Sequence, residues 1–191
     1  MDIKKEKEIE IIEAAGKVFS EYGFHKAKMQ QIADTANVGK GTIYEYFKGK
    51  NHLFEEMIKH FIISYISSLE YLIDNSNDLE DTLVEIANFH GLFIRKHIDM
   101  WSNLMSNQID ISEDMKREIC SIKEELLNTV SKLIKKYKNK GEIKDIDERI
   151  FVISLFGTLN LFYAEGIGIG RKKLDNIDPK PVIDILINGI K

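Results

Sequence analysis

The sequence has little of what marks an exported, membrane-bound or disulfide-stabilised protein. It contains a single cysteine, Cys120, so no disulfide can form within the chain, as is usual in a reducing compartment. No apolar run reaches the roughly 18 residues that suggest a membrane-spanning helix. The first ten residues, MDIKKEKEIE, are charged throughout and do not resemble a secretory signal. We therefore expect a cytoplasmic protein with no membrane partner.

Proline is nearly absent as well. Only Pro179 and Pro181 occur in 191 residues, both near the C-terminus. Because proline breaks helices, its absence elsewhere allows long helices to form. With 43% hydrophobic and 30% charged residues, the composition suits a mostly helical protein. No strand-like alternation, internal repeat or low-complexity tract competes with this interpretation. The sequence predicts an all-α fold.

No catalytic or metal-binding set of residues can be argued from the spacing of the side chains. The five histidines form no His-x3-His pair, and the one cysteine forms no Cys-x2-Cys pair, so we expect no metal site. The run from Gly166 to Gly170 lacks the spacing of a dinucleotide-binding loop, and we expect no cofactor. Because no nucleophile or acid-base pair is evident, an enzyme is the most distant of the functions considered.

One stretch, residues 28–47, has the pattern of two short helices joined by a tight turn. In KMQQIADTANVGKGTIYEYF, Ile32 and Ala33 lie on the inner face of the first helix, and Ile43 and Phe47 anchor the second helix against it. The outward face of the second helix carries a cation, hydroxyls and phenols: Lys40, Thr42, Tyr44, Glu45 and Tyr46. Such side chains can reach phosphates and base edges when a helix enters the major groove.

The residues around this stretch follow a pattern with many fixed offsets. The matching positions are Gly23-Phe24, Ile32-Ala33, Val38, Lys40-Gly41-Thr42-Ile43-Tyr44, Phe47 and Lys50. With these features, residues 23–54 resemble the DNA-binding module of the TetR family of bacterial transcriptional regulators. Two positions differ from that family: Lys28 stands in place of a capping Ser or Thr, and Gly39 in place of Ser. The usual hydroxyl contacts to phosphate are therefore missing at both.

The resemblance implies a helix-turn-helix that binds double-stranded DNA, with an inverted-repeat operator read by a homodimer. The expected DNA-binding residues are Lys28, Lys40, Gly41, Thr42, Tyr44, Tyr46 and Lys50. Among them, Lys40, Thr42 and Tyr44 should reach bases or nearby phosphates. The residues at helix starts and rims, Lys28, Tyr46 and Lys50, should hold the DNA backbone.

The charge of the chain is divided in a way that suits DNA binding. The whole chain carries a net charge of -4. Between Phe24 and His52, however, five lysines face only Asp34 and Glu45, so this segment carries +3 and the rest carries -7. A basic patch on an acidic body is typical of a protein that meets phosphate with one small face.

The helical patterns predict two domains. Residues 4–22 form an amphipathic helix that ends at Gly23. Residues 51–74 form a second long helix, whose 24 residues would span about 36 Å. We predict a DNA-binding domain at residues 4–65 and a C-terminal effector-binding and dimerisation domain at residues 66–191, with the long helix shared between them.

Aromatic residues and methionines gather in the C-terminal part, in a predicted helix at 79–97 and a separate short segment at 99–108. Each one alone is more often a core residue, but together they suit an adaptable apolar pocket with a few polar anchors. TetR-like proteins carry their effector pocket in this part of the chain. The expected pocket residues are Phe61, Tyr65, Phe89, His90, Phe93, Met100, Trp101 and Met105.

Two helices near the C-terminus are more apolar than one core requires. Residues 147–165 are apolar nearly all round, and a last short helix begins at Pro179. We expect their outer faces to form a homodimer interface, through Phe156, Leu159, Ile183, Leu186 and Ile187. The alternative is a monomer whose last helix closes the bundle.

Taken together, these patterns predict a dimeric DNA-binding regulator, a repressor that a small apolar or amphipathic effector releases from DNA. The alternative is a DNA-bound interaction protein of the same fold, which recruits a protein partner and has no small-molecule inducer. A ligand that fills the C-terminal pocket and changes DNA affinity would distinguish the two.

Overall fold

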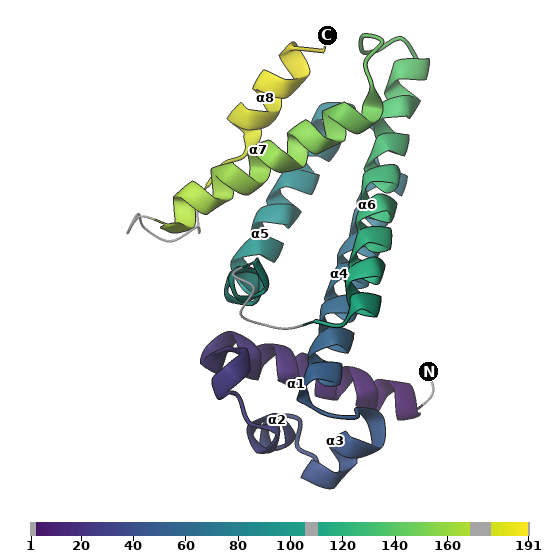
Figure 1. The fold of residues 1–191 in the computed structure, drawn as a ribbon. Coiled ribbons are helices and arrows are strands. Elements are labelled where there is room, and N and C mark those ends of the chain that lie inside the picture. The colour runs from purple at the N-terminus through teal and green to yellow at the C-terminus, as the bar shows by residue number, and fades with distance from the viewer. Residues whose placement is uncertain (1–2, 106–110, 169–176, 191) are drawn as a thin grey trace. The chain divides into compact units, whose positions relative to one another are not determined.

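A computed structural model describes residues 3–105, 111–168 and 177–190, and within these ranges all regular structure is helical. Figure 1 shows the helices in chain order. They are α1 Ile3–Lys26, α2 Met29–Thr35, α3 Lys40–Tyr46, α4 Lys50–Asp74, α5 Leu79–Met105, α6 Glu113–Asn139, α7 Glu148–Gly168 and α8 Lys180–Asn188. The all-α prediction is confirmed.

Two helices differ from the predicted boundaries. α1 continues to Lys26, but Gly23 interrupts its geometry with φ 71° and ψ 159°, a conformation that glycine adopts without steric cost. α5 is one continuous helix, where the sequence predicted a helix to His97 and a separate segment from Asp99. Because neither proline nor glycine stands between these two residues, nothing local ends the helix there.

The chain divides into two compact units. The first contains residues 1–63 and 97–120, and the second contains residues 64–96 and 121–191. We had placed the domain boundary between residues 65 and 66, close to the division within α4. Residues 97–120, which we had placed in the C-terminal domain, belong to the first unit.

The first unit has a core made by α1, α2, α3 and the beginning of α4. Its most deeply buried side chains include Ile11, Ala15, Phe19, Ile32, Ala33, Ile43, Phe47, Leu53, Phe54, Met57 and Ile58. The Phe54 ring lies 5.3 Å from that of Phe19 and 4.9 Å from that of Phe24, measured between centroids. Each large apolar side chain buried in this way contributes roughly 1.5–3 kcal/mol before entropy is counted. This core fixes α2 and α3 against α1.

The beginning of α6 also belongs to this core. The Met115 side chain is 1% exposed and packs into the same cluster. The Ser112 backbone N–H donates to Glu55 Oε1 at 2.8 Å, and Lys59 Nζ lies 2.7 Å from Glu118 Oε2. Residues after 110 therefore complete the core of the helix-turn-helix, which explains why the first unit is discontinuous in sequence.

The second unit has its own core, built from the remaining parts of α4, α5 and α6 together with α7 and α8. The buried residues include Leu69, Leu83, Ile86, Ala87, Val130, Leu133, Ile134, Val152, Leu155, Leu159, Ile183 and Ile187. The backbone N–H of Lys144 donates to the Ile190 carbonyl at 2.7 Å, which joins the loop before α7 to the end of α8. Across the described ranges, no helix is both long and apolar enough to span a membrane.

Candidate nucleic-acid interface and effector region

The outer face of α3 is exposed, as the sequence pattern indicated. Ile43 and Phe47 are buried at 0% and 1% exposure and hold α3 on the core, whereas Tyr44 is 50% exposed. Lys40 and Gly41 are also exposed. Thr42 and Tyr46 are half-buried, and Tyr46 packs against the edge of the core. The face of α3 that points away from the core therefore offers an ammonium group, a hydroxyl and phenols.

The turn between α2 and α3 sets the direction of this face. Asn37 adopts φ 53°, a left-handed conformation that asparagine tolerates better than most residues. The Val38 N–H donates to the Ala33 carbonyl at 3.0 Å, and the Asn37 N–H donates to the Asp34 carbonyl at 3.2 Å. The chain thus reverses over a few residues while its backbone groups stay paired.

The two positions that depart from the TetR pattern are accommodated differently. At the start of α2, the Lys28 backbone N–H donates to Gln31 Oε1 at 2.8 Å, so Gln31 supplies half of a capping box where no hydroxyl is present. The Lys28 side chain is exposed. At the start of α3, Gly39 provides no side-chain cap.

Lys50, the first residue of α4, is placed differently from the other cations of the patch. Its Nζ donates to the Ala27 carbonyl at 2.7 Å and to the His25 carbonyl at 3.1 Å. The same ammonium lies 4.7 Å from the centroid of the Phe24 ring. Partial burial lowers the pKa of Lys50. We had expected this side chain to hold the DNA backbone, whereas the structure directs it to the end of α1.

In the second unit, four of the expected pocket residues form one aromatic cluster around Tyr65. Its ring centroid lies 5.2 Å from that of Phe89, 5.8 Å from that of His90 and 4.6 Å from that of Phe93. Phe89 and Phe93 are half-buried, whereas Tyr65 and His90 are buried. The cluster therefore reaches from the interior of the second unit to its surface.

A polar contact lies inside this cluster. The Tyr65 hydroxyl and His90 Nδ1 are 2.7 Å apart, and His90 Nε2 lies 3.3 Å from Asn160 Oδ1. Burial raises the pKa of Tyr65 and lowers the pKa of His90 to about 4, so both side chains are neutral at pH 7. Because the amide oxygen can only accept, His90 Nε2 carries the proton and the Tyr65 hydroxyl donates to Nδ1.

Tyr163 is a further buried polar residue of this region, and no local pattern in the sequence singles it out. Its hydroxyl donates to the Ala87 carbonyl at 2.8 Å, and burial raises its pKa to about 12. The ring packs so closely on Gly91 that a Cβ there would lie 2.4 Å from Cζ. Asn160 was missed for the same reason as Tyr163: each meets its partner across about 70 residues of chain, and no local pattern signals such a contact.

The other expected pocket residues lie elsewhere. Phe61 belongs to the first unit, where its ring lies 4.5 Å from that of His97 and close above Gly16. Met100, Trp101 and Met105 are on α5, but their side chains lie outside the part of the chain whose side chains the structure describes. The cluster around Tyr65 is therefore the part of the expected pocket that the structure brings together.

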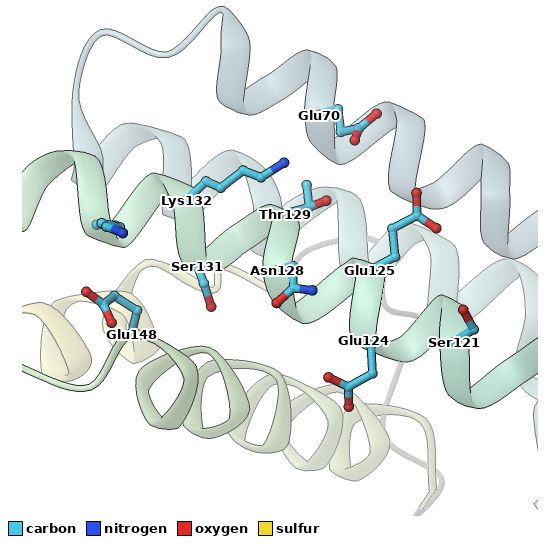
Figure 2. A pocket seen from close by; sticks show the side chains of 10 residues that line it. Glu70, Ser121, Glu124, Glu125, Asn128, Thr129, Ser131, Lys132 and Glu148 are labelled. Carbon is cyan, nitrogen blue, oxygen red and sulfur yellow. The ribbon is translucent and has the colours of Figure 1, made fainter.

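Two of the open grooves on the second unit are lined by residues that the structure describes. The larger, of about 740 Å³, runs along α6 and is lined by polar side chains; Figure 2 shows Glu125 and Lys132 pointing from α6 toward α4, and Glu124 toward α7. Arg149 holds Glu124 through two hydrogen bonds of 2.8 Å and thereby lowers its pKa. The smaller groove, of about 520 Å³, is lined by Ser64, Ser67, Ser68, Tyr71, Leu72, Glu85 and Phe89. Only the smaller groove includes a residue of the aromatic cluster.

The expected interface residues lie mostly inside the protomer. Phe156, Leu159, Ile183 and Ile187 are buried at 0–8% exposure in the core of the second unit, and Leu186 is half-buried. Four other apolar residues of α7 and α8 are 51–75% exposed: Ile150, Ile153, Leu161 and Ile185. On α7 they recur with Gly157 and Ala164, which are also exposed, at three- and four-residue intervals, so they form one stripe. An apolar surface exists on these helices, but other residues form it.

Comparisons with known proteins agree with the helix-turn-helix. Residues 11–57 match the model of the bacterial regulatory proteins of the tetR family. The chain is 27% identical to the fatty acid metabolism regulator protein of Bacillus subtilis, over 100% of this chain and 98% of that protein.

Solved structures are similar over nearly the whole chain. The transcriptional regulator FadR from Bacillus subtilis, in complex with stearoyl-CoA, matches with a TM-score of 0.74 and 23% identity, over 96% of this chain and 99% of that one. The fatty acid degradation regulator FadR from Bacillus halodurans matches with a TM-score of 0.74 and 24% identity, over 96% and 99% of the two chains. At these identities the likeness shows the fold, in both units.

Proposed function

Because this chain belongs to the TetR family of bacterial transcriptional regulators, we propose that it is a repressor which a long-chain acyl thioester releases from DNA. Its activity is then binding rather than catalysis, and it acts in the cytoplasm, where its operator is. The observation that carries the DNA-binding part is the exposed face of α3, held on a rigid core by Ile43 and Phe47. In this proposal, Lys40, Thr42 and Tyr44 reach from that face to an inverted-repeat operator in double-stranded DNA.

The effector proposal rests on the aromatic cluster and on the relative that matches along the whole chain. The relative's name assigns it to fatty acid metabolism, and a structurally similar regulator holds stearoyl-CoA. In this chain, Phe89 both lines the smaller groove and stacks on Tyr65. An acyl chain that enters by this groove would meet Tyr65, Phe93 and the buried residues behind them. Soft, apolar surroundings with a few polar groups suit such a ligand.

Release of DNA follows from linkage between the two binding events. α4 is a single helix that carries Leu53 and Phe54 in the core of the first unit and Tyr65 in the cluster of the second. A ligand that binds one arrangement of α4 better than another changes DNA affinity, and DNA then weakens the ligand by the same factor. Such coupling is typically worth about 1–3 kcal/mol, or roughly 5- to 150-fold.

Titration of the protein–operator complex tests this function. We expect stearoyl-CoA to release an operator selected from random DNA, and coenzyme A alone to leave the complex intact, as followed by fluorescence anisotropy of the labelled duplex. Phe93→Ala should weaken the effect of stearoyl-CoA about tenfold, because a large apolar contact is lost. Leu92→Ala is the matched control, since Leu92 is a large apolar residue of the same helix that is 55% exposed and lines neither groove.

The outcomes separate the two parts of the proposal. If the chain selects an operator but stearoyl-CoA and coenzyme A behave alike, the acyl thioester is wrong and the DNA-binding function stands. If no duplex is enriched over random sequence, the regulatory function itself is wrong.

For the dimer, we propose the exposed stripe of α7 together with α8. Ile153, Leu161 and Ile185 are apolar residues that a lone protomer leaves in water, and exposed apolar patches of this kind mark interaction sites. A two-fold axis through this surface would repeat the same residues on both protomers. The buried residues that we first expected at the interface then support α7 and α8 from inside.

Leu161→Glu should therefore split the dimer. We expect monomers in sedimentation velocity and at least a tenfold loss of operator affinity, because the two half-sites are no longer bound together. Leu92→Glu is the matched control, because Leu92 lies on α5 and is 55% exposed. The Leu92→Glu protein should remain dimeric. A Leu161→Glu protein that still sediments as a dimer places the interface elsewhere.

A further inference from the structure

We infer that Lys50 positions the helix-turn-helix from within the protein and does not bind DNA phosphate. This inference rests on the DNA-binding function proposed above and does not depend on the effector. The observation behind it is the contact of the Lys50 ammonium with the carbonyls of His25 and Ala27.

The two carbonyls lie at the point where α1 ends. Gly23 breaks the helix geometry with its positive φ, and α1 finishes at Lys26. The last carbonyls of a helix have no partner within it and carry partial negative charge. A lysine ammonium is a suitable partner for such carbonyls. Lys50 thus stabilises a helix end whose backbone would otherwise need water or another donor.

The same contact joins three elements. Ala27 is 3% exposed and stands between the end of α1 and Lys28, where α2 begins. Lys50 is the first residue of α4, and its ammonium also lies over Phe24, whose ring contacts Phe54 of α4. The Lys50 ammonium therefore fixes the connection between α1 and α2 to the start of α4. These two segments stand on either side of α2 and α3 in the sequence.

This geometry differs from that of the exposed lysines in the patch. Lys40, the first residue of α3, is exposed, and its ammonium is accessible to phosphate. The Lys50 ammonium is within hydrogen-bond distance of two carbonyls, so to bind phosphate it would have to leave charge-assisted hydrogen bonds, which are stronger than neutral ones.

The salt dependence of DNA binding distinguishes the two roles. The variants are Lys50→Met, which keeps an unbranched apolar side chain over Phe24, and Lys40→Met, which removes the same charge from the same position of another helix. Each is titrated with a labelled duplex of random sequence between about 50 and 200 mM salt. The temperature is set below the melting temperature of both variants, with the fold checked by circular dichroism.

For Lys40→Met we expect the slope of log affinity against log salt to fall by about 0.9, the value for one lost phosphate contact. For Lys50→Met we expect an unchanged slope, an affinity about tenfold lower at every salt concentration, and a melting temperature lower by about 5 °C. A slope that falls for Lys50→Met would overturn the inference, because Lys50 then binds phosphate. Unchanged affinity with a lower melting temperature would also overturn it, since Lys50 would then stabilise the unit without positioning it. If the wild-type protein does not bind the duplex, the proposed function fails instead.

Discussion

Replacing Gly91 by alanine is expected to lower the melting temperature by about 10 °C. The new Cβ would lie 2.4 Å from Tyr163 Cζ and 2.8 Å from its hydroxyl oxygen, so the ring must move. Tyr163 is buried and its hydroxyl donates to the Ala87 carbonyl, and a displaced ring leaves that hydroxyl without its hydrogen-bond partner. Overpacking costs about 1–3 kcal/mol and an unsatisfied buried group a further 1–3 kcal/mol. In a chain of this size, each kcal/mol lowers the melting temperature by about 2–4 °C.

Thermal unfolding followed by circular dichroism measures this effect. Gly41→Ala is the matched control, because a Cβ there meets nothing within 4 Å. Alanine also stabilises a helix by about 1 kcal/mol relative to glycine, so the melting temperature of this variant should not fall. Tyr163→Leu should cost less when alanine already occupies position 91, which a double-mutant cycle detects. Additive losses would mean that Gly91 does not act through Tyr163.

The second large effect is a loss of stability in mild acid that depends on His90. Its pKa is 6.5 in a model peptide and about 4 in the folded protein, where burial disfavours the charged ring. Between these values the unfolded chain binds a proton that the folded chain does not, so stability falls as the pH is lowered through 6.5 and the loss is complete near pH 4. At 1.36 kcal/mol per pH unit, the total is about 3 kcal/mol. Tyr65 and Tyr163 face His90 but have raised pKa values and do not titrate in this range.

Urea unfolding at a series of pH values tests this prediction, with His90→Gln as the comparison. Glutamine can still donate and accept hydrogen bonds in the cluster but does not titrate there. The wild-type free energy of unfolding should fall more steeply than that of the variant between pH 6.5 and 4. Parallel curves for the two proteins would show that His90 is not kept neutral by the fold.

The helix-turn-helix was predictable from sequence because its determinants are local. The spacing of Ile32, Ala33, Ile43 and Phe47 defines two inner faces within a few turns of chain, and the structure buries all four. The exposed position of Tyr44 then follows from helix geometry alone. The boundary between the units was harder to predict. Met115 belongs to the first core although all of α5 precedes it in the sequence, and periodicity does not indicate which core an apolar residue joins.

The remaining differences have a common physical cause. The apolar content predicted that α7 and α8 carry more apolar residues than one core can bury. It did not predict which of them face inward. Phe156 and Leu159 are buried, whereas Ile153 and Leu161 face water. Likewise, the sequence showed that Lys50 is basic, but not where its ammonium points. The two carbonyls that accept its hydrogen bonds belong to residues about 25 positions earlier. Both outcomes depend on which helices pack together, and tertiary contacts decide this.

The place of Met115 has a consequence for the order in which this protein can mature on the ribosome. The recognition helix is synthesised early, but the core that supports it lacks Met115, with the half-buried Ile111 and Ile119 beside it, until α5 and the first turns of α6 have been made. A nascent or prematurely terminated chain that ends within α5 would present α3 on a core that lacks Met115. A complete core beneath the helix-turn-helix is thereby reserved for chains that have been synthesised through α5 and into α6.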